Sequence, residues 1–192
     1  MTNAMSLPVG TPQGADDEMR ELLLGAIPAL RAFAFSLTYD LDRSDDLVQD
    51  TLVRAWTKAD SFTRGTNLTA WLFTILRNLF YSEQRKRKRE IEDADGGHAG
   101  RLTSLPEQEV RVEMRAFQSA LNLLPLAQRE ALVLVGAQSF TYEEAAEICG
   151  VAVGTIKSRV SRARGRLIET LGMDGAGDIG TDARTRAALE AG

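Results

Sequence analysis

One segment constrains the fold of this chain more than any other: a short helix, a tight turn and a basic second helix between Thr141 and Leu167. Thr141 and Glu144 have the spacing of a capping box, in which two side chains satisfy free backbone N–H groups at a helix start. Gly150 marks the turn, because glycine adopts positive φ at no steric cost. The second helix would begin near Ala152, which is a poor N-cap. The segment therefore predicts a helix-turn-helix.

The second helix of this segment is apolar on one side and basic on the other. Its apolar residues recur at the helical period, as Val153, Ile156, Val160, Ala163, Leu167 and Leu171. The polar and basic residues away from this stripe or at its margins are Thr155, Lys157, Ser158, Arg159, Arg162, Arg164 and Arg166. An ordinary surface helix with a solvated basic face has a similar stripe. The cap, the turn and the absence of Asp and Glu from Val151 to Ile168 favour a helix that reads the major groove of DNA.

Composition limits the alternatives. The chain has 192 residues, enough for one domain or two small ones, and its 44% hydrophobic content supports packed cores. The single cysteine, Cys149, permits no intrachain disulfide, and we expect it to be a small core residue of a cytoplasmic protein. No apolar run approaches about 18 residues and no secretory signal is evident, so we expect no membrane span.

The net charge of −4 conceals patches of opposite sign. Residues 85–89 are an unbroken basic run, and the helix described above is a second basic cluster. Five aspartates gather between Asp40 and Asp50. Because salt screens charges beyond about 8–10 Å, an acidic protein can still bind DNA through local basic patches. The acidic patch suggests a second, basic partner that is a protein.

The hydrophobic pattern predicts helices throughout and no strands. We expect helices at 19–38, from an N-cap at Ser44 onward, at 68–88, at 110–124 and at 126–137, with Pro28 a potential kink or break. The helix that starts at Ser44 would bury Val48, Leu52, Ala55, Trp56 and Ala59. The helix at 68–88 has more aromatic residues than one face can bury, namely Trp71, Phe73, Phe80 and Tyr81. The predicted organisation is a disordered tail at 1–18, a domain at 19–89, a flexible linker at 90–106, a domain at 107–171 and a tail at 172–192, with the two domains moving independently.

Catalytic and cofactor sites are not predicted. The motif from Gly175 to Gly180 has the GxGxxG spacing but lacks the strand and helix that dinucleotide binding requires. The single histidine, His98, lies in the predicted linker, where catalytic groups would not be held in position. Asp46 and Asp50 lack a third ligand of clear spacing, so we expect partner binding rather than a metal there. We therefore expect no enzyme, no cofactor and no metal site.

Four segments, in family order, resemble the group 4, or extracytoplasmic-function (ECF), sigma factors of bacterial RNA polymerase. Asp45–Trp56, Ala70–Asn78, Leu124–Leu132 and Gly154–Arg164 are similar to regions 2.2, 2.3/2.4, 4.1 and 4.2 of that family. The resemblance covers roughly 19–89 and 106–171. It implies an all-α protein with two small helical domains, sigma2 and sigma4, joined by a flexible linker.

The resemblance also implies three groups of binding residues. Those for core polymerase, at its β′ clamp, are Asp45, Asp46, Leu47, Gln49, Asp50 and Trp56. Those for the −10 promoter element are Phe62, Asn67 and Asn78, suited to a flipped base, and Arg85, Lys86, Arg87, Lys88 and Arg89, suited to phosphates. Those for the −35 element are Thr155, Lys157, Ser158, Arg159, Arg162 and Arg166, with Arg159 and Arg162 as base contacts. The β flap would be the polymerase partner of sigma4.

A narrower resemblance concerns the stretch 136–164, which looks like the sigma factors of the alphaproteobacterial general stress response. That subfamily is held inactive by a NepR-type anti-sigma factor, which a phosphorylated PhyR-type regulator removes. It implies a chain that is monomeric when free or paired 1:1 with its anti-sigma factor. Two other classes stay open: a stand-alone dimeric helix-turn-helix regulator, which would not need the first two motifs, and a sigma mimic that titrates an anti-sigma factor, which has no use for the basic run.

Overall fold

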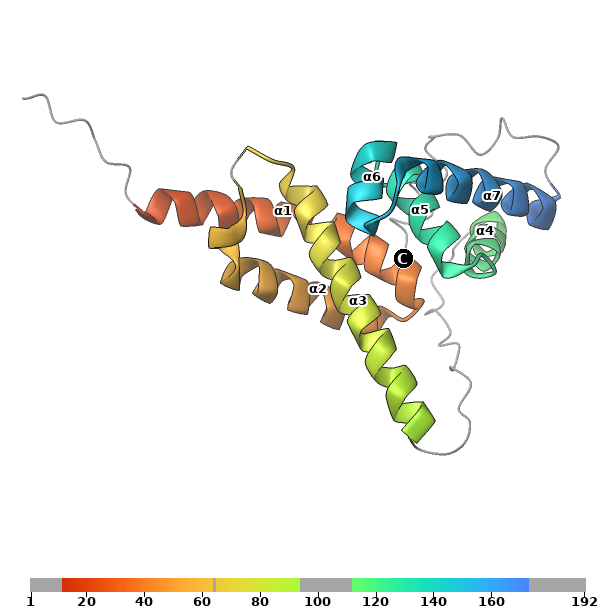
Figure 1. Cartoon of the computed structure of the whole chain (residues 1–192), viewed down its shortest axis with the longest axis horizontal. Coiled ribbons are helices and arrows are strands. Elements are labelled where there is room, and N and C mark those ends of the chain that lie inside the picture. The colour runs from red at the N-terminus through yellow and green to blue at the C-terminus, as the bar shows by residue number, and fades with distance from the viewer. Residues whose placement is uncertain (1–11, 64, 94–111, 173–192) are drawn as a thin grey trace, which may run out of the picture.

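The structure is a computed structural model that describes residues 12–63, 65–93 and 112–172. Every regular element within these ranges is a helix, which confirms the predicted all-α class (Figure 1). The elements are α1 (Pro12–Thr38), α2 (Leu41–Thr57), the 3₁₀ helix η1 (Ala59–Ser61), α3 (Leu68–Asp93), α4 (Val112–Asn122), α5 (Leu126–Gly136), α6 (Tyr142–Cys149) and α7 (Val153–Leu171).

Helices α1, α2 and α3 pack against one another as an N-terminal helical group. Leu30 and Phe33 of α1 and Leu72, Phe73 and Leu76 of α3 are 0% exposed at its centre. The Phe33 and Phe73 rings stack with their centroids 4.9 Å apart. The C-terminal half of α3 extends away from the rest of the molecule (Figure 1), so the basic run at its end is presented to solvent.

Helices α4 to α7 form a C-terminal helical group, in which α7 packs on α4, α5 and α6. The predicted capping box is present, since Thr141 accepts a hydrogen bond from the Glu144 N–H at 3.1 Å while the Glu144 carboxylate accepts one from the Thr141 N–H at 2.9 Å. Gly150 turns the chain at φ 63°, as expected, and Ala152 starts α7 without a side-chain cap. The helix-turn-helix prediction is therefore confirmed.

The two helical groups pack together, because α1 contacts α5 and α3 contacts α6. Their buried side chains form one continuous core. Phe73 of α3 meets Phe140, just before α6, with ring centroids 5.0 Å apart. The predicted independent movement of the two domains concerns motion, which this one arrangement does not test, so it stays a prediction. This packing explains why α3 has more aromatic residues than one face can bury. Part of the apolar surface of α3 is covered by the C-terminal helical group.

Several helix boundaries differ from the prediction. Helix α1 starts at Pro12, not at residue 19, so part of the predicted tail is helical; proline suits a first turn, where its missing N–H has no partner to lose. The same helix runs through Pro28 without a break. Pro28 deprives the Leu24 carbonyl of its donor, but both residues are exposed, so water can satisfy that carbonyl.

The N-cap of α2 is Asp40, not Ser44 as predicted. The Asp40 side chain accepts from the Arg43 N–H at 3.1 Å, and α2 begins at Leu41. Ser44 is 0% exposed, and its hydroxyl donates to the Asp40 carbonyl at 2.6 Å within the first turn. Either residue type fits an N-cap, so the sequence alone could not choose between them.

Helix α3 continues to Asp93, so residues 90–93 are helical and not part of a linker. The rest of the predicted linker with His98, the glycine motif at 175–180 and the remaining tail positions lie outside the described residues. Between Asp17 and Thr38, α1 is long and apolar enough to cross a membrane by length and composition, which the sequence expectation missed. The apolar residues Leu30 and Phe33 of this segment are buried in the core, which accounts for its composition.

Candidate polymerase and nucleic-acid interfaces

An exposed face of α2 combines acidic and apolar side chains. Asp45, Asp46, Gln49 and Asp50 are all exposed, as a binding surface requires. Trp56 is 49% exposed, against the prediction that it lies in the buried stripe of this helix. Val53, which sequence reasoning did not select, is 60% exposed. Its spacing from Gln49 and Trp56, four and three residues, places it on the same side of α2.

Two of the residues predicted for this face, Leu47 and Asp45, are not freely available to a partner: the first is buried and the second is ion-paired. Leu47 is 1% exposed, so its side chain packs in the core and is not available to a partner; this corrects its assignment to the polymerase-binding set. Asp45 forms an ion pair with Arg31 of α1 at 2.7 Å. Because both side chains are about half exposed, this pair adds little to stability.

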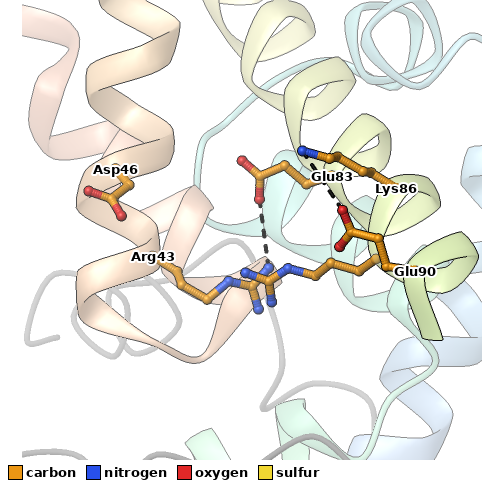
Figure 2. Close-up of a pocket in the computed structure, with 6 residues that line it drawn as sticks. Arg43, Asp46, Glu83, Lys86 and Glu90 are labelled. Atoms are coloured by element: carbon orange, nitrogen blue, oxygen red, sulfur yellow. Dashed lines mark ion pairs between the residues drawn. The ribbon is translucent and has the colours of Figure 1, made fainter. Parts of the chain in front are cut away.

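A hollow of mixed charge separates the start of α2 from the extended end of α3. Figure 2 shows Arg43 reaching from α2 to Glu83 of α3, at 3.8 Å, and Lys86 lying 3.9 Å from Glu90. Asp46 and Arg87 also line this hollow. The acidic face of α2 therefore borders directly on the basic run of α3.

Of the residues predicted to capture a −10 base, Phe62 and Asn67 precede α3 in the chain and Asn78 lies within it. Asn67 precedes the helix, and its side-chain oxygen accepts from the Ala70 N–H at 3.1 Å, which makes it a helix cap. Phe62 packs against Trp71 with ring centroids 5.2 Å apart. Asn78 is exposed two turns after Trp71, on the same side of the helix. Trp71 is partly buried against the core, in agreement with the core position preferred for it.

The Asn67 side chain also contacts the other helical group. Its Nδ2 donates to the Glu144 Oε1 in the first turn of α6 at 2.8 Å. The pKa of Glu144 is lowered, first by the hydrogen bond from the Thr141 backbone and then by the Asn67 side chain. This contact joins the proposed base-capture region to the helix-turn-helix.

The basic run of α3 is exposed along its length, from Arg85 to Arg89. Arg89 donates from Nε to the Arg85 carbonyl at 3.3 Å. Because all five side chains are exposed, an extended anion such as a nucleic-acid backbone can approach them.

Helix α7 buries the middle of the predicted stripe and exposes most of the predicted reading face. Val153 and Leu171, at the ends of the stripe, are partly buried against the core. Ile156, Val160, Ala163 and Leu167 are at most 1% exposed. Lys157, Arg162 and Arg166 are exposed, and Thr155 and Ser158 are partly so. Arg159 differs from the expectation that it projects to solvent, because it is only partly exposed and its Nη1 is buried without a hydrogen-bond partner.

Sequence reasoning missed a cluster of polar groups between the two helical groups. Glu130 of α5 is 0% exposed, accepts from Arg77 Nε of α3 at 2.6 Å and accepts from the Tyr81 hydroxyl at 3.3 Å. Burial first, and Glu130 second, raise the pKa of Tyr81 to about 12. Burial also raises the pKa of the Cys149 thiol to about 12, so this core cysteine stays protonated. A buried Glu can be suspected only when its partner is known, and the partner lies 53 residues away in sequence.

Comparisons with known proteins match both halves. Residues 23–90 match the family model for sigma-70 region 2, and residues 114–167 match that for sigma-70 region 4. The ECF RNA polymerase sigma factor EcfG of Rhodopseudomonas palustris (strain TIE-1) is 58% identical over 173 residues, covering 90% of this chain and 96% of that protein. The sigma factor NccH of Alcaligenes xylosoxydans xylosoxydans is 36% identical over 140 residues, which cover 66% of this chain and 72% of that protein. The sigma factor RpoE of Bartonella quintana, crystallised with the anti-sigma factor NepR, superposes with a TM-score of 0.75 at 55% identity, covering 82% of this chain and 99% of that one.

Proposed function

Because the chain belongs to the ECF sigma factors of the sigma-70 family, we propose that it binds core RNA polymerase and directs transcription initiation from specific promoters. The observation that carries this function is the pairing of two surfaces in one chain: the exposed acidic and apolar face of α2 and the basic face of α7, which has no Asp or Glu before Glu169. A DNA-binding helix alone would not require the first surface. A polymerase-binding module alone would not require the second.

The face of α2 is proposed as the contact with the β′ clamp of core polymerase. Val53 and Trp56 supply exposed apolar area, and Asp46 and Asp50 supply charge for a basic partner. Tryptophan is enriched among the residues that dominate binding free energy at protein interfaces, while surrounding charges steer association. Gln49 and Asp45 belong to the same exposed surface, and Leu47 supports it from the core.

The start and the extended end of α3 are proposed to hold the −10 element. Phe62 stands beside Trp71 and offers an aromatic surface to an unstacked base, and Asn78 offers an exposed amide to its edge. Asn67 is the second amide candidate, although in this arrangement its side chain caps α3 and bonds Glu144. The run from Arg85 to Arg89 would hold phosphates without reading sequence.

Helix α7 is proposed as the reader of the −35 element in the major groove. Arg162 is the leading base contact, because it is exposed at the middle of the helix. Lys157 and Arg166 flank it, and Thr155, Ser158 and Arg159 complete the face. An arginine bidentate to guanine contributes about 1–3 kcal/mol of discrimination.

The regulation follows from similarity to a sigma factor solved with NepR. We propose that an anti-sigma factor of the NepR type holds this chain inactive in a 1:1 complex in the cytoplasm, and that its promoters serve the general stress response. The role is one of recognition, with no catalytic step assigned to any residue.

The test is reconstitution of the purified chain with bacterial core RNA polymerase on a library of promoter fragments. Run-off transcripts that share −35 and −10 elements would support the proposal. Tight duplex binding without polymerase, together with no transcription, would identify a stand-alone regulator instead. Neither activity, from a preparation free of inhibitor, would favour a sigma mimic.

A further inference from the structure

We propose that the hollow between the start of α2 and the end of α3 receives a carboxylate side chain of core RNA polymerase, with Arg43 as the residue that binds it. The inference rests on the proposed function, because it adds an acid-binding element to the acidic and apolar docking face of α2. It is carried by the unpaired donors of Arg43, by the balanced charges around them and by the place of the hollow beside Asp46.

The guanidinium of Arg43 has two buried donors without an acceptor. Its Nε and Nη2 atoms are buried and make no hydrogen bond, although the Arg43 side chain as a whole is 25% exposed. The carboxylate of its ion-pair partner, Glu83, lies 3.8 Å from Nη2, which is beyond hydrogen-bonding distance. A buried donor left unpaired costs free energy, so an acceptor that reached these atoms would recover that cost.

These two atoms form one edge of the arginine fork. The N–H bonds of Nε and Nη2 lie in the plane of the guanidinium and point the same way, so they match the two oxygens of a carboxylate or a phosphate. A lysine presents a single charged centre and has no such edge. The chemical class that fits Arg43 is therefore an oxyanion that accepts two parallel hydrogen bonds.

The hollow has room for such a group. Its cavity volume is about 230 Å³, whereas a single water needs only about 10–15 Å³. Figure 2 shows Arg43 reaching toward α3, which contributes Glu83, Lys86 and Glu90 to the opposite wall. Each of these three side chains is at least 40% exposed. They can therefore rotate aside to admit a side chain from a partner.

The charges of the hollow favour a single acid over a row of them. The lining residues are three bases and three acids, namely Arg43, Lys86, Arg87, Asp46, Glu83 and Glu90. Duplex DNA carries one negative charge per about 1.7 Å of helix axis, so a backbone that placed one phosphate on Arg43 would bring others against the three acids. A protein side chain brings one carboxylate, and basic residues beside it can meet the acids.

The position of the hollow identifies the partner. Arg43 precedes Asp46 by three residues and Asp50 by seven, so all three lie on the same side of α2. Asp46 belongs both to the proposed docking face and to the lining of the hollow. A polymerase surface that covers this face therefore reaches Arg43 as well. Charges of both signs fix the register of docking and disfavour wrong partners, so we expect an acid among the bases of that surface.

The test removes the two ends of the internal ion pair separately. Arg43→Gln abolishes the fork, so it should raise the Kd for core polymerase by at least about tenfold, chiefly through faster dissociation, as for a desolvated charge pair. Arg43→Lys, which keeps the charge without the fork, should restore only part of the affinity. Glu83→Gln removes the internal competitor for Arg43, so it should lower the Kd, by up to about fivefold for a partly exposed pair.

Surface plasmon resonance with the full chain and bacterial core polymerase measures the Kd and the dissociation rate, and chemical denaturation checks the fold of each variant. Arg20→Gln makes the same change of charge at an exposed position of α1 and should leave the Kd unchanged. The partner acid is located with a panel of core polymerases in which single acids of the clamp are replaced by lysine. One member of the panel should bind Arg43→Glu more tightly than it binds the parent chain.

Equal weakening of polymerase binding by Arg43→Gln and Glu83→Gln would overturn the proposal, because it would show that the pair only holds α2 to α3. Reduced transcription by Arg43→Gln with an unchanged Kd for polymerase would overturn it in favour of a DNA phosphate. So would a panel in which no lysine substitution favours Arg43→Glu. If the parent chain does not bind polymerase, the proposed function fails as well. If Trp56→Ala weakens binding and Arg43→Gln does not, only the assignment of the hollow fails.

Discussion

The guanidinium of Arg129 lies 4.6 Å from the ring centre of Tyr39, the residue that turns the chain between α1 and α2. Tyr39 adopts φ 52° there, a left-handed conformation that non-glycine residues seldom take. Burial raises the pKa of Tyr39 to about 12, although Arg129 acts in the opposite direction, and burial lowers the pKa of Arg129. A residue of the C-terminal helical group thus packs on a strained turn in the N-terminal one.

Alkaline pH should therefore destabilise the protein through its buried tyrosines. Tyr39 and Tyr81 both have a pKa raised from 10.0 to about 12. A raised pKa means that the folded state favours the neutral phenol, so the associated stability is complete below pH 10 and is lost as the pH rises toward 12. Ultraviolet absorbance of the phenolate should show two tyrosines ionising near pH 12 in the folded chain. Tyr39→Phe and Tyr81→Phe should each remove one of these ionisations. Ionisation of all three tyrosines in a single step near 10 would contradict the prediction.

Substitutions of Leu47 and Trp56 should have different effects although both residues lie on α2: the first should lower stability and the second should weaken polymerase binding. Leu47 is 1% exposed, so Leu47→Ala should lower the free energy of unfolding by about 2–5 kcal/mol through the cavity it leaves. Trp56 is 49% exposed, so Trp56→Ala should leave stability nearly unchanged while weakening binding to core polymerase by about 2 kcal/mol or more. Chemical denaturation and a polymerase binding assay measure the two effects.

Thr57→Ala, at the exposed neighbour of Trp56, is the matched control and should leave polymerase binding intact. A large loss of stability in Trp56→Ala would mean that the tryptophan is structural. Undiminished polymerase binding by the folded Trp56→Ala variant would remove α2 from the proposed docking surface.

The sequence predicts the elements of this fold well where local chemistry decides them. The capping box at Thr141 and Glu144, the turn at Gly150 and the stripe of α7 each depend on residues within one or two helical turns. It failed where one local choice was as good as another, as with Asp40 and Ser44 at the start of α2. The hydrophobic period also failed at Trp56, which is 49% exposed, because a period cannot distinguish a core stripe from a partner-binding stripe. The family resemblance had placed the same residue in the polymerase-binding set.

The contacts between the helical groups were beyond sequence reasoning for a different reason. Arg77 and Glu130 are 53 residues apart, and Arg129 and Leu37 are 92 apart. A single sequence has no period that connects such positions. The excess of aromatic residues on α3 was the one available sign, and it indicated that the helix had a second buried face without indicating which element covered it.

Reversal of charge on α2 should weaken polymerase binding without changing the fold. Asp46 is exposed, and an arginine in its place would meet a basic partner with a like charge, so Asp46→Arg should raise the Kd for core polymerase by at least about tenfold. The defect should arise mainly from slower association and should diminish with salt, which screens exposed charges. Glu169→Arg, the same reversal on exposed α7, should leave the Kd unchanged. An equal effect of both reversals would show that only net charge matters and would count against a specific contact on α2.

Arg162 should separate promoter recognition from polymerase binding. Its side chain is exposed on α7, so Arg162→Ala should not disturb the fold. The lost base contact should cost about 1–3 kcal/mol at the −35 element, which corresponds to roughly a 5- to 150-fold loss of transcription from a matched promoter at limiting holoenzyme. Competition between sigma factors for core polymerase should be unaffected. Ser161→Ala, at an exposed neighbour on the same helix, should retain full transcription. If Arg162→Ala weakened transcription equally on promoters with and without the −35 element, the arginine would be a phosphate contact, because only a base contact loses its effect when the base it reads is changed.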